Sequence, residues 1–349
     1  MTRPDVRLDR IGIVMMSAIG DAVHVLPVVT ALKRHRPTSR ITWVLQPGPA
    51  ALVRGHPDVD EIVVFDRKRG RRAFLDVREA LRERPLDLVL ALQTYFKAGL
   101  VTSFARAPVK LGFDRARSRD LSWLFSTHRI PSRPTAHMQD EYFEFLEYLG
   151  VPHEPVEWKL GPWPQERDAQ RALLARFDRP LAALVVGSSK PEKDWPAERW
   201  AAVADALYAD HGLQPVLVGG RSPREAEMER VIMERARHRP VSLLDSGLRP
   251  LVGILDAAAL VVSLDTGPLH MAVALDRPVV SLVGYTDPRR TGPYRRFQDL
   301  AIDAFHDPGE DGPISRATRT GRMARISVRD VLERVELWSA RYRAPARTA

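Results

Sequence analysis

The stretch that decides the fold is "LVVSLDTGPLHMAVALDRPVVSLV", which runs from Leu260 to Val283. Its apolar run at Leu260–Leu264 predicts a buried strand, and Val279–Val283 predicts another. Between them, Leu269–Leu275 has the character of a short helix. A strand, a helix and a second strand in this order predict one βαβ unit of a parallel sheet.

Both halves of the chain repeat this alternation of short apolar runs and helical segments. In the first half, strands are expected at Ile11–Met16, Ile41–Leu45, Glu61–Phe65 and Leu86–Leu92, and helices at Asp21–Arg34, Arg71–Glu83 and Met138–Leu149. In the second half, further strands are expected at Leu181–Val186, Pro215–Val218 and Val241–Leu243, and helices at Pro196–His211, Pro223–Arg237, Leu248–Ala258 and Val328–Tyr342. The pattern predicts an α/β protein with two doubly wound domains.

The segment from Gly150 to Pro180 interrupts the alternation with five prolines. Because proline fixes φ and removes a backbone donor, a central strand or a long helix is not expected there. We therefore divide the chain into an N-terminal domain at 1–160, a linker at 161–180, a C-terminal domain at 181–327, and a helix and tail at 328–349.

The composition is that of a globular protein, with 44% hydrophobic and 28% charged residues in a chain of 349. No apolar run approaches the roughly 20 residues of a membrane span, and the first apolar run is too short for a secretory signal. We therefore expect a cytoplasmic protein. The absence of cysteine excludes disulfides, thiolate metal sites and a cysteine nucleophile.

The net charge of +9 suits an anionic partner. The excess of basic residues is spread along the chain, which also fits an ordinary solvated surface. One cluster stands out directly after the strand expected at Glu61–Phe65, and it consists of Arg67, Lys68, Arg69, Arg71 and Arg72. Such a cluster is either a solvated face or a site for a phosphate-bearing ligand.

Four stretches of polar residues follow expected strands, where open α/β sheets bind their ligands. The first is "MMSAIGDAVHVLP", from Met15 to Pro27. Asp21 lies at the start of the expected helix, either as a capping residue or as a general base. His24 lies one turn further on the same helix face, with a role in packing or in binding.

The second stretch is "VVGSSKPEKDWP", from Val185 to Pro196. Ser188, Ser189 and Lys193 precede a helix there, as in a phosphate cradle or an ordinary polar loop. The third stretch has two glycines after a strand and Glu225 in the next helix. That carboxylate could accept hydrogen bonds from a ribose, although this signal is weak by itself.

The fourth stretch is "DTGPLH", Asp265 to His270, with "GYTDPRRTGPY" after the following strand. Gly267 permits close approach of a ligand to the backbone, and Thr266 adds a hydroxyl group. The N-terminus of the next helix favours an anion. His270, in the first turn of that helix, either faces the ligand or bonds to a neighbouring loop.

In combination these motifs resemble the heptosyltransferase-like glycosyltransferases (glycosyltransferase family 9), which include the lipopolysaccharide ADP-heptose transferases. "SAIGD" with the following "VH" and "LP", "GSS" with "WP" and "ERW", "DTGPLH", and "TDP" with "RTGPY" occur in the order of the family. The resemblance covers about Ile11 to Val335. "LALQTYFKAGL" and "GFDRARSRD" are similar to acceptor-side segments of the family, whereas Tyr285 stands where proline is usual.

The resemblance implies a GT-B fold, in which two Rossmann-like domains face each other across a cleft. The N-terminal domain would bind the acceptor and the C-terminal domain the nucleotide-sugar. It implies inverting glycosyl transfer without a metal or another cofactor, with Asp21 as the catalytic base. The implied donor-side residues are Ser188, Ser189, Lys193, Asp265, Thr266, Gly267 and His270, to which we add Glu225. Lys97 and Arg119 are implied on the acceptor side, together with His24, Arg67, Lys68 and Arg71.

The implied donor is ADP-heptose, and the implied acceptor is an anionic glycolipid or glycan such as the bacterial lipopolysaccharide core. We expect a monomer without a nucleic-acid partner, located in the cytoplasm and peripheral to the inner membrane. One alternative is a non-catalytic protein that binds nucleotide-sugars or nucleic acids, although aromatic residues are not interleaved with the basic runs. Another is a nucleotide-sugar epimerase. A dehydrogenase is disfavoured because no GxGxxG follows the first strand.

Overall fold

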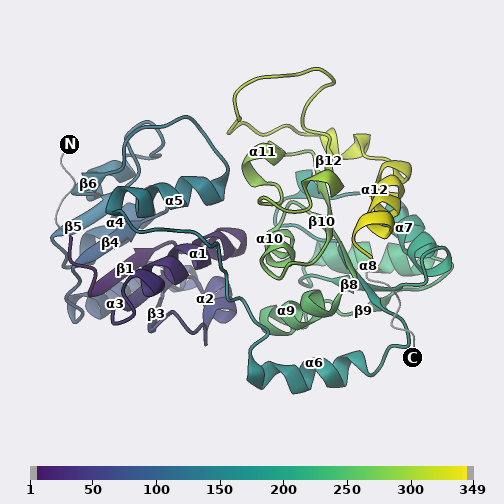
Figure 1. The fold of residues 1–349 in the computed structure, drawn as a ribbon, viewed down its shortest axis with the longest axis horizontal. Helices are drawn as coiled ribbons and strands as arrows, with labels where there is room; N and C mark the ends of the chain where they lie inside the picture. The colour runs from purple at the N-terminus through teal and green to yellow at the C-terminus, as the bar shows by residue number, and fades with distance from the viewer. Residues whose placement is uncertain (1–5, 344–349) are drawn as a thin grey trace. The chain divides into compact units, whose positions relative to one another are not determined.

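The computed structural model describes residues 6–343 and divides into two compact units at Leu160 and Gly161. Each unit is an α/β domain built on one sheet of six parallel strands (Figure 1). The prediction of two Rossmann-like domains is thereby confirmed.

The sheet of the N-terminal unit has the strand order β3-β2-β1-β4-β5-β6. Its strands are β1 (Arg10–Val14), β2 (Arg40–Leu45), β3 (Glu61–Val64), β4 (Leu88–Ala91), β5 (Val109–Gly112) and β6 (His128–Arg129). Its helices are α1 (Ile19–His35), α2 (Pro47–Val53), α3 (Arg71–Arg82), α4 (Phe96–Phe104) and α5 (Met138–Leu149), with the 3₁₀ turns η1 (Arg67–Arg69) and η2 (Ser122–Phe125). Strand order reverses between β1 and β4, which is where folds of this kind bind ligands.

The sheet of the C-terminal unit has the equivalent order β12-β11-β10-β7-β8-β9. Its strands are β7 (Leu181–Val185), β8 (Gln214–Val218), β9 (Val241–Ser242), β10 (Leu260–Leu264), β11 (Val279–Val283) and β12 (Ala301–Asp303). Its helices are α6 (Arg167–Leu174), α7 (Ala197–Ala209), α8 (Pro223–Arg235), α9 (Leu248–Ala257), α10 (Gly267–Ala274), α11 (Pro288–Thr291) and α12 (Val328–Arg341), with the 3₁₀ turns η3 (Pro164–Glu166), η4 (Pro191–Lys193), η5 (Gln298–Leu300) and η6 (Arg322–Arg325).

The central strands are apolar on both faces because helices cover both sides of each sheet. Every residue of β4, β7, β10 and β11 is buried. Burial of each Val, Leu or Ile side chain contributes roughly 1.5–3 kcal/mol, so these strands form the cores. In the N-terminal unit, Trp43 lies fully inside and its indole N–H donates to the carbonyl of Met15 at 3.1 Å, which fixes the end of β1.

A buried ionic cluster joins the segment after β5 to α5. The guanidinium of Arg117 contacts the carboxylate of Asp114 and donates to Oε1 of Glu144 at 2.8 Å. It also donates to the carbonyl of Pro131 at 2.9 Å. Burial by itself raises the pKa of the Asp114 carboxyl, but the hydrogen bond and charge of Arg117 outweigh burial and hold this pKa below its usual value.

The strands and helices named from the sequence are present, with ends that differ by a few residues. The main difference lies at 161–180, which we expected to be a linker. This segment holds η3 and α6, and α6 packs against α9 of the C-terminal unit. Arg249 stabilises it, because its guanidinium lies 3.6 Å from the Trp163 ring centroid and pairs with Glu166 at 2.6 Å.

Some elements of the N-terminal unit were not predicted, including α2, α4, β5 and β6. In the C-terminal unit β12 and α11 were also missed. All of them are short, and a short element has too few residues to show a clear period. Within residues 6–343, no helix is both long and apolar enough to cross a membrane.

Candidate functional site

A cavity of about 460 Å³ lies at the carboxyl ends of the strands in the N-terminal unit. Residues that follow β1, β2, β3 and β4 line it, and these are Met16, Ser17, Gln46, Phe65, Arg67, Gln93 and Tyr95. Gly70, Arg71 and Phe74 at the start of α3, and Lys97 and Ala98 in α4, complete the wall. The cavity thus occupies the point where strand order reverses, as expected for a ligand site.

The cavity wall is basic and aromatic. Three of the predicted acceptor-side residues, Arg67, Arg71 and Lys97, belong to it, and no described carboxylate lines it. Gln93 fixes the floor, because its amide accepts from Met16 N–H at 3.1 Å and donates to the Ser17 carbonyl at 2.7 Å. This surface is suited to an anionic ligand with an apolar part.

Two further predicted acceptor-side residues lie near this cavity without lining it. Arg119 places its guanidinium 5.9 Å from the ring centroid of Tyr95, a lining residue. Lys68 lies in η1 next to Arg67, is exposed, and its backbone N–H donates to Asp66. Of the predicted basic residues, Arg67, Arg71 and Lys97 line the cavity and Arg119 lies beside one of its lining residues. Lys68 is linked to the cavity only as the sequence neighbour of Arg67.

Asp21 lies in the first turn of α1 and is partly exposed. Its Oδ2 accepts from the backbone N–H of Ala18 at 2.8 Å, and the Tyr142 hydroxyl lies 3.5 Å from Oδ1. The capping role is therefore present. Asp21 follows Ser17, a residue of the cavity wall, by four positions in the sequence, and its catalytic role stays a prediction.

His24 belongs to α1, which packs against α5, and it is buried inside the unit with 3% of its surface exposed. Its Nδ1 is 3.2 Å from Oε1 of Gln139, and the Gln139 amide donates to the His24 carbonyl at 2.7 Å. The ring of His137 packs edge-on at 5.6 Å. The structure thus gives His24 the packing role that its sequence position also allowed, and not a place in the cavity wall.

In the C-terminal unit, the loops after β7 and β10 meet at an ion pair. Lys193 donates from Nζ to Oδ2 of Asp265 at 2.7 Å and to its carbonyl at 2.8 Å. Asp265 is 6% exposed, so this pair is largely desolvated on the acid side. An ammonium carries three N–H donors, so a phosphate oxygen can be added to these two contacts.

Two threonines that follow β11 complete this cluster, Thr286 from the loop and Thr291 from the end of α11. Thr286 donates to Oδ2 of Asp265, and Thr291 lies 3.3 Å from the same oxygen and 3.0 Å from the Thr286 hydroxyl. The Asp265 carboxylate thus gathers an ammonium and two hydroxyl groups. Its arrangement makes Asp265 an anchor that orients donors rather than a group that itself faces an anion.

The loop after β7 is fixed by a second set of contacts. Ser188 donates to Oδ1 of Asp194 at 2.7 Å, and Arg224 of α8 donates to Oδ2 of Asp194 at 2.6 Å. Arg224 also donates to the Ser188 carbonyl at 2.7 Å. Burial raises the pKa of Asp194, against the opposing effects of Ser188 and Arg224. Ser189 is exposed at the tip of this loop.

Glu225 occupies the third position of α8 and caps it. Its carboxylate accepts from the backbone N–H of Gly220 at 2.8 Å and of Ser222 at 2.9 Å. A Cβ at Gly187 would lie 2.3 Å from this side chain, so only glycine fits there. Glu225 therefore joins the loops after β7 and β8, and its contact with a ribose stays a prediction.

The remaining donor-side residues lie at the start of α10. Thr266 precedes the helix, Gly267 begins it, and His270 is 8% exposed in its first turn. Aligned peptide dipoles make such an N-terminus favourable for an anion. The structure thus brings together Ser188, Lys193, Asp265 and the start of α10 at the carboxyl ends of neighbouring strands.

Sequence reasoning missed four residues of this site, namely Asp194, Arg224, Thr286 and Thr291. The two threonines were inside a quoted motif, "GYTDPRRTGPY", so their hydroxyl groups were an available signal. Arg224 gave no such signal, because it lies in the first turn of a helix and its contact with Asp194 spans 30 residues.

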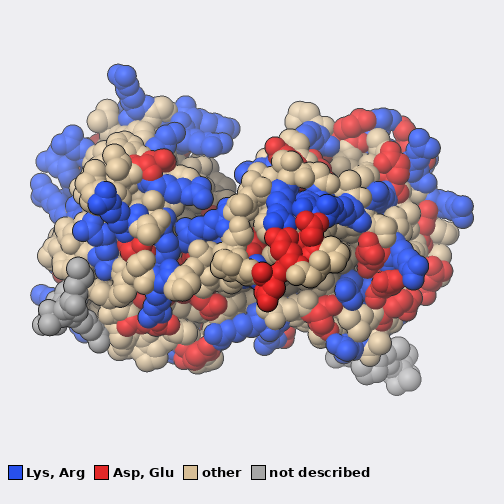
Figure 2. All heavy atoms as spheres, turned by 90° about the horizontal axis from the view of Figure 1, so that it is seen from above, with Lys and Arg blue, Asp and Glu red and all other residues tan. Residues whose placement is uncertain are grey.

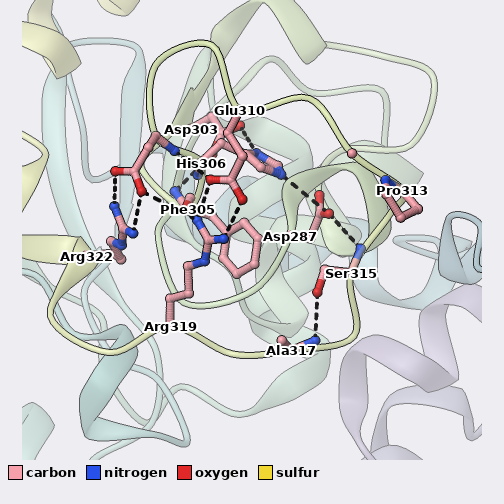
Figure 3. A network of polar contacts seen from close by, with 12 residues as sticks. Asp287, Asp303, Phe305, His306, Glu310, Pro313, Ser315, Ala317, Arg319 and Arg322 are labelled. Carbon is pink, nitrogen blue, oxygen red and sulfur yellow. Dashed lines mark hydrogen bonds and ion pairs between the residues drawn. The ribbon is translucent and has the colours of Figure 1, made fainter.

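A polar network holds the segment that follows β12 (Figure 3). Arg319 pairs with Glu310 and donates to the Phe305 carbonyl at 2.7 Å, and Asp287 accepts from Ser315 N–H at 2.9 Å. The hydrogen bond from Arg319 lowers the pKa of Glu310 to about 2. Because the backbone N–H of Arg319 donates to the Tyr285 carbonyl at 2.9 Å, this network positions the loop that carries Thr286.

Among residues 6–343, no three His, Asp or Glu side chains gather as metal ligands would. The N-terminal unit offers a basic cavity, and the C-terminal unit offers an ammonium beside a helix N-terminus at the carboxyl ends of neighbouring strands. Both surfaces suit anionic groups of a ligand.

Comparison with known proteins gives a consistent result. A family model described as "Glycosyltransferase family 9 (heptosyltransferase)" matches residues 74–304. Lipopolysaccharide core heptosyltransferase OpsX of Haemophilus influenzae is 29% identical, over 92% of this chain and 94% of its own.

Solved structures of the same family are also similar to this chain. A glycosyl transferase family 9 protein from Veillonella parvula has a TM-score of 0.81 at 24% identity, over 96% of this chain and 98% of its own. This comparison shows that the two chains share a fold. The E. coli heptosyltransferase WaaC with ADP-2-deoxy-2-fluoro heptose has a TM-score of 0.71 at 25% identity, over 94% of this chain and 99% of its own.

Proposed function

The chain belongs to glycosyltransferase family 9, the heptosyltransferases, and from that premise we propose that it transfers heptose from ADP-heptose to a lipopolysaccharide-core acceptor. We propose that the transfer inverts the anomeric centre and needs no metal. The donor assignment is supported by the structure of the similar WaaC with ADP-2-deoxy-2-fluoro heptose, an ADP-heptose analogue. The acceptor assignment is supported by the similarity to OpsX, a lipopolysaccharide core heptosyltransferase.

The observation that carries the proposal is the Lys193–Asp265 pair beside the start of α10. When the bond between the sugar and the diphosphate breaks, negative charge grows on the leaving group. The Lys193 ammonium and the N-terminus of α10 are already fixed, so they would stabilise that charge without reorganising. Loss of one such donor typically costs roughly 3–4 kcal/mol in the barrier, so we propose that this cluster stabilises the leaving diphosphate.

In this proposal Asp21 acts as the general base. One displacement at the anomeric carbon forms the bond to the acceptor oxygen while the bond to the diphosphate oxygen breaks. The acceptor hydroxyl gives its proton to the Asp21 carboxylate, and the electron pair of the broken bond leaves with ADP. A positioned base contributes about 10²–10⁴-fold to such a step.

The basic cavity of the N-terminal unit is the proposed acceptor site. Arg67, Arg71 and Lys97 would bind carboxylate or phosphate groups of the acceptor, and Phe74 and Tyr95 would pack against its sugar rings. We propose further that the protein acts as a monomer in the cytoplasm, peripheral to the inner membrane, and without a nucleic-acid partner.

The proposal is tested by assaying the purified chain with ADP-heptose and a heptose-free lipopolysaccharide core. We expect release of ADP that depends on the acceptor, formation of one heptosyl product of inverted configuration, and an unchanged rate in excess EDTA. Replacing ADP-heptose by UDP-glucose is the control, for which we expect no product. ADP-heptose turnover without any acceptor would contradict transfer and favour an epimerase.

The donor site is tested separately through Lys193→Ala. We expect ADP to bind at least about tenfold more weakly by calorimetry, since one charge-assisted hydrogen bond contributes roughly 1.5–3 kcal/mol. Arg329→Ala is the matched control, because Arg329 is a cation of the same unit whose side chain is 86% exposed. Unchanged ADP affinity in folded Lys193→Ala would remove Lys193 from the diphosphate site.

A further inference from the structure

The N-terminal unit exposes a group of large apolar side chains next to the basic cavity. Among residues 6–343, six large hydrophobic side chains are exposed, and four of them belong to α4 and η2 or lie beside them. They are Tyr95 at 48%, Phe96 at 46%, Leu121 at 58% and Leu124 at 58%. We call these four residues the α4–η2 surface. Single exposed apolar residues are ordinary, but a contiguous group marks an interaction site.

Tertiary contacts bring this surface together from segments about 25 residues apart. The η2 turn packs against α4, and the ring of Phe96 meets that of Phe125 edge-on at 5.4 Å. The Ser122 hydroxyl donates to the Thr94 carbonyl at 2.7 Å. The contacts therefore hold Leu121 and Leu124 beside Tyr95 and Phe96.

The backbone at Leu121 is itself unusual. Asp120 and Leu121 adopt left-handed conformations, with φ of 50° and 59°. This region is unfavourable for leucine, whose Cβ crowds the backbone, and asparagine or glycine tolerates it better. The left-handed backbone costs stability, and the exposed side chain gains none from burial within the chain. A strained and exposed leucine therefore fits a side chain whose partner lies outside the chain.

The surroundings of the surface are strongly basic. Residues 95–129 contain seven Lys and Arg against two Asp and no Glu. Two of these cations, Arg115 and Arg129, flank the ring of Trp123 with guanidinium-to-centroid distances of 4.8 and 5.4 Å. Figure 2 shows Lys and Arg predominating over Asp and Glu on the visible face of this unit. An apolar centre, an indole ring and a basic rim together match the boundary of an anionic bilayer.

We propose that the α4–η2 surface docks the N-terminal unit on the headgroup region of an anionic phospholipid membrane. Leu121 and Leu124 would enter the boundary between headgroups and acyl chains, while Arg115 and Arg129 would contact lipid phosphates. Tyr95 belongs both to this surface and to the cavity wall, so docking places the cavity mouth near the membrane. The inference rests on the proposed function, because it assigns a surface to the proposed peripheral membrane location and would present a lipid-anchored acceptor to the cavity.

The test is flotation of the full chain with vesicles of phosphatidylcholine containing about 30 mol% phosphatidylglycerol. We expect the double variant Leu121→Asn, Leu124→Ser to bind these vesicles at least about tenfold more weakly than the unchanged chain. Asparagine suits the left-handed backbone at position 121, so the variant should stay folded. Leu75→Ser is the matched control, since Leu75 is 61% exposed on α3 of the same unit, and we expect less than about a twofold change.

Three outcomes would overturn the proposal. They are absence of vesicle binding by the unchanged chain, equal binding by the double variant, and equally tight binding to pure phosphatidylcholine. Self-association that the double variant loses, without vesicle binding, would assign the surface to a second copy of the chain instead. Turnover with an acceptor freed of its acyl chains should remain in the double variant. Loss of docking and failure of the proposed function are therefore distinguishable.

Discussion

Asp21→Asn is expected to lower kcat by about 10²–10⁴-fold while ADP affinity stays within about twofold. The amide cannot take the proton of the acceptor hydroxyl. Its oxygen can still accept the hydrogen bond from the backbone N–H of Ala18 that Oδ2 accepts now at 2.8 Å. The measurement is steady-state turnover with ADP-heptose together with calorimetry of ADP binding.

The control for this variant separates catalysis from helix capping. Asp330 occupies the third position of α12 and accepts from the backbone N–H of Ser327 at 2.7 Å, the same capping contact at another helix. Asp330→Asn should therefore match Asp21→Asn in its small effect on stability and leave kcat unchanged. Full turnover in Asp21→Asn would exclude Asp21 as the base.

Arg117→Met is expected to lower the free energy of unfolding of the N-terminal unit by about 3–5 kcal/mol. Methionine fills most of the same volume but leaves the carboxylates of Asp114 and Glu144 buried without their cation. These side chains are 9% and 7% exposed, so water cannot replace the guanidinium. The measurement is urea unfolding followed by circular dichroism.

Arg72→Met is the control, because the Arg72 side chain is 76% exposed and lies 3.9 Å from Asp76. A surface pair of this kind contributes about 0–1 kcal/mol. A loss in Arg117→Met no larger than this would show that the buried cluster does not stabilise the unit.

The pH dependence of the Arg117→Met effect follows from the lowered pKa of Asp114. A carboxyl with a lowered folded-state pKa contributes stability that is present above its unfolded-state value of about 3.9. That contribution is lost as the pH falls through the folded-state pKa. The difference in stability between the unchanged chain and Arg117→Met should therefore shrink as the pH falls below about 4.

Family membership decides among the functions that the residues alone left open. Composition and motifs allowed a binding protein, an epimerase or a transferase. The match of the family model to residues 74–304 makes the chain a glycosyltransferase. The turnover assay with ADP-heptose and the calorimetry of ADP binding test which sugar, nucleotide and acceptor it uses.

The sequence by itself determined the fold class and the strand ends at which ligands bind. Apolar runs such as Leu260–Leu264 and Val279–Val283 coincide with β10 and β11 residue for residue. This was possible because burial between two helix layers requires an apolar residue at nearly every position of a short strand. Polar residues directly after such a run are visible as a local pattern.

Only the tertiary structure decided which of those polar residues act together. Lys193 and Asp265 are 72 residues apart, yet they form one ion pair because β7 and β10 are neighbours in the sheet. The structure also showed that His24 is buried beside Gln139 of α5 and that Glu225 caps α8, contacts that their sequence positions did not specify. Contacts of this kind depend on strand order and helix packing, which are properties of the whole domain and not of any local stretch of sequence.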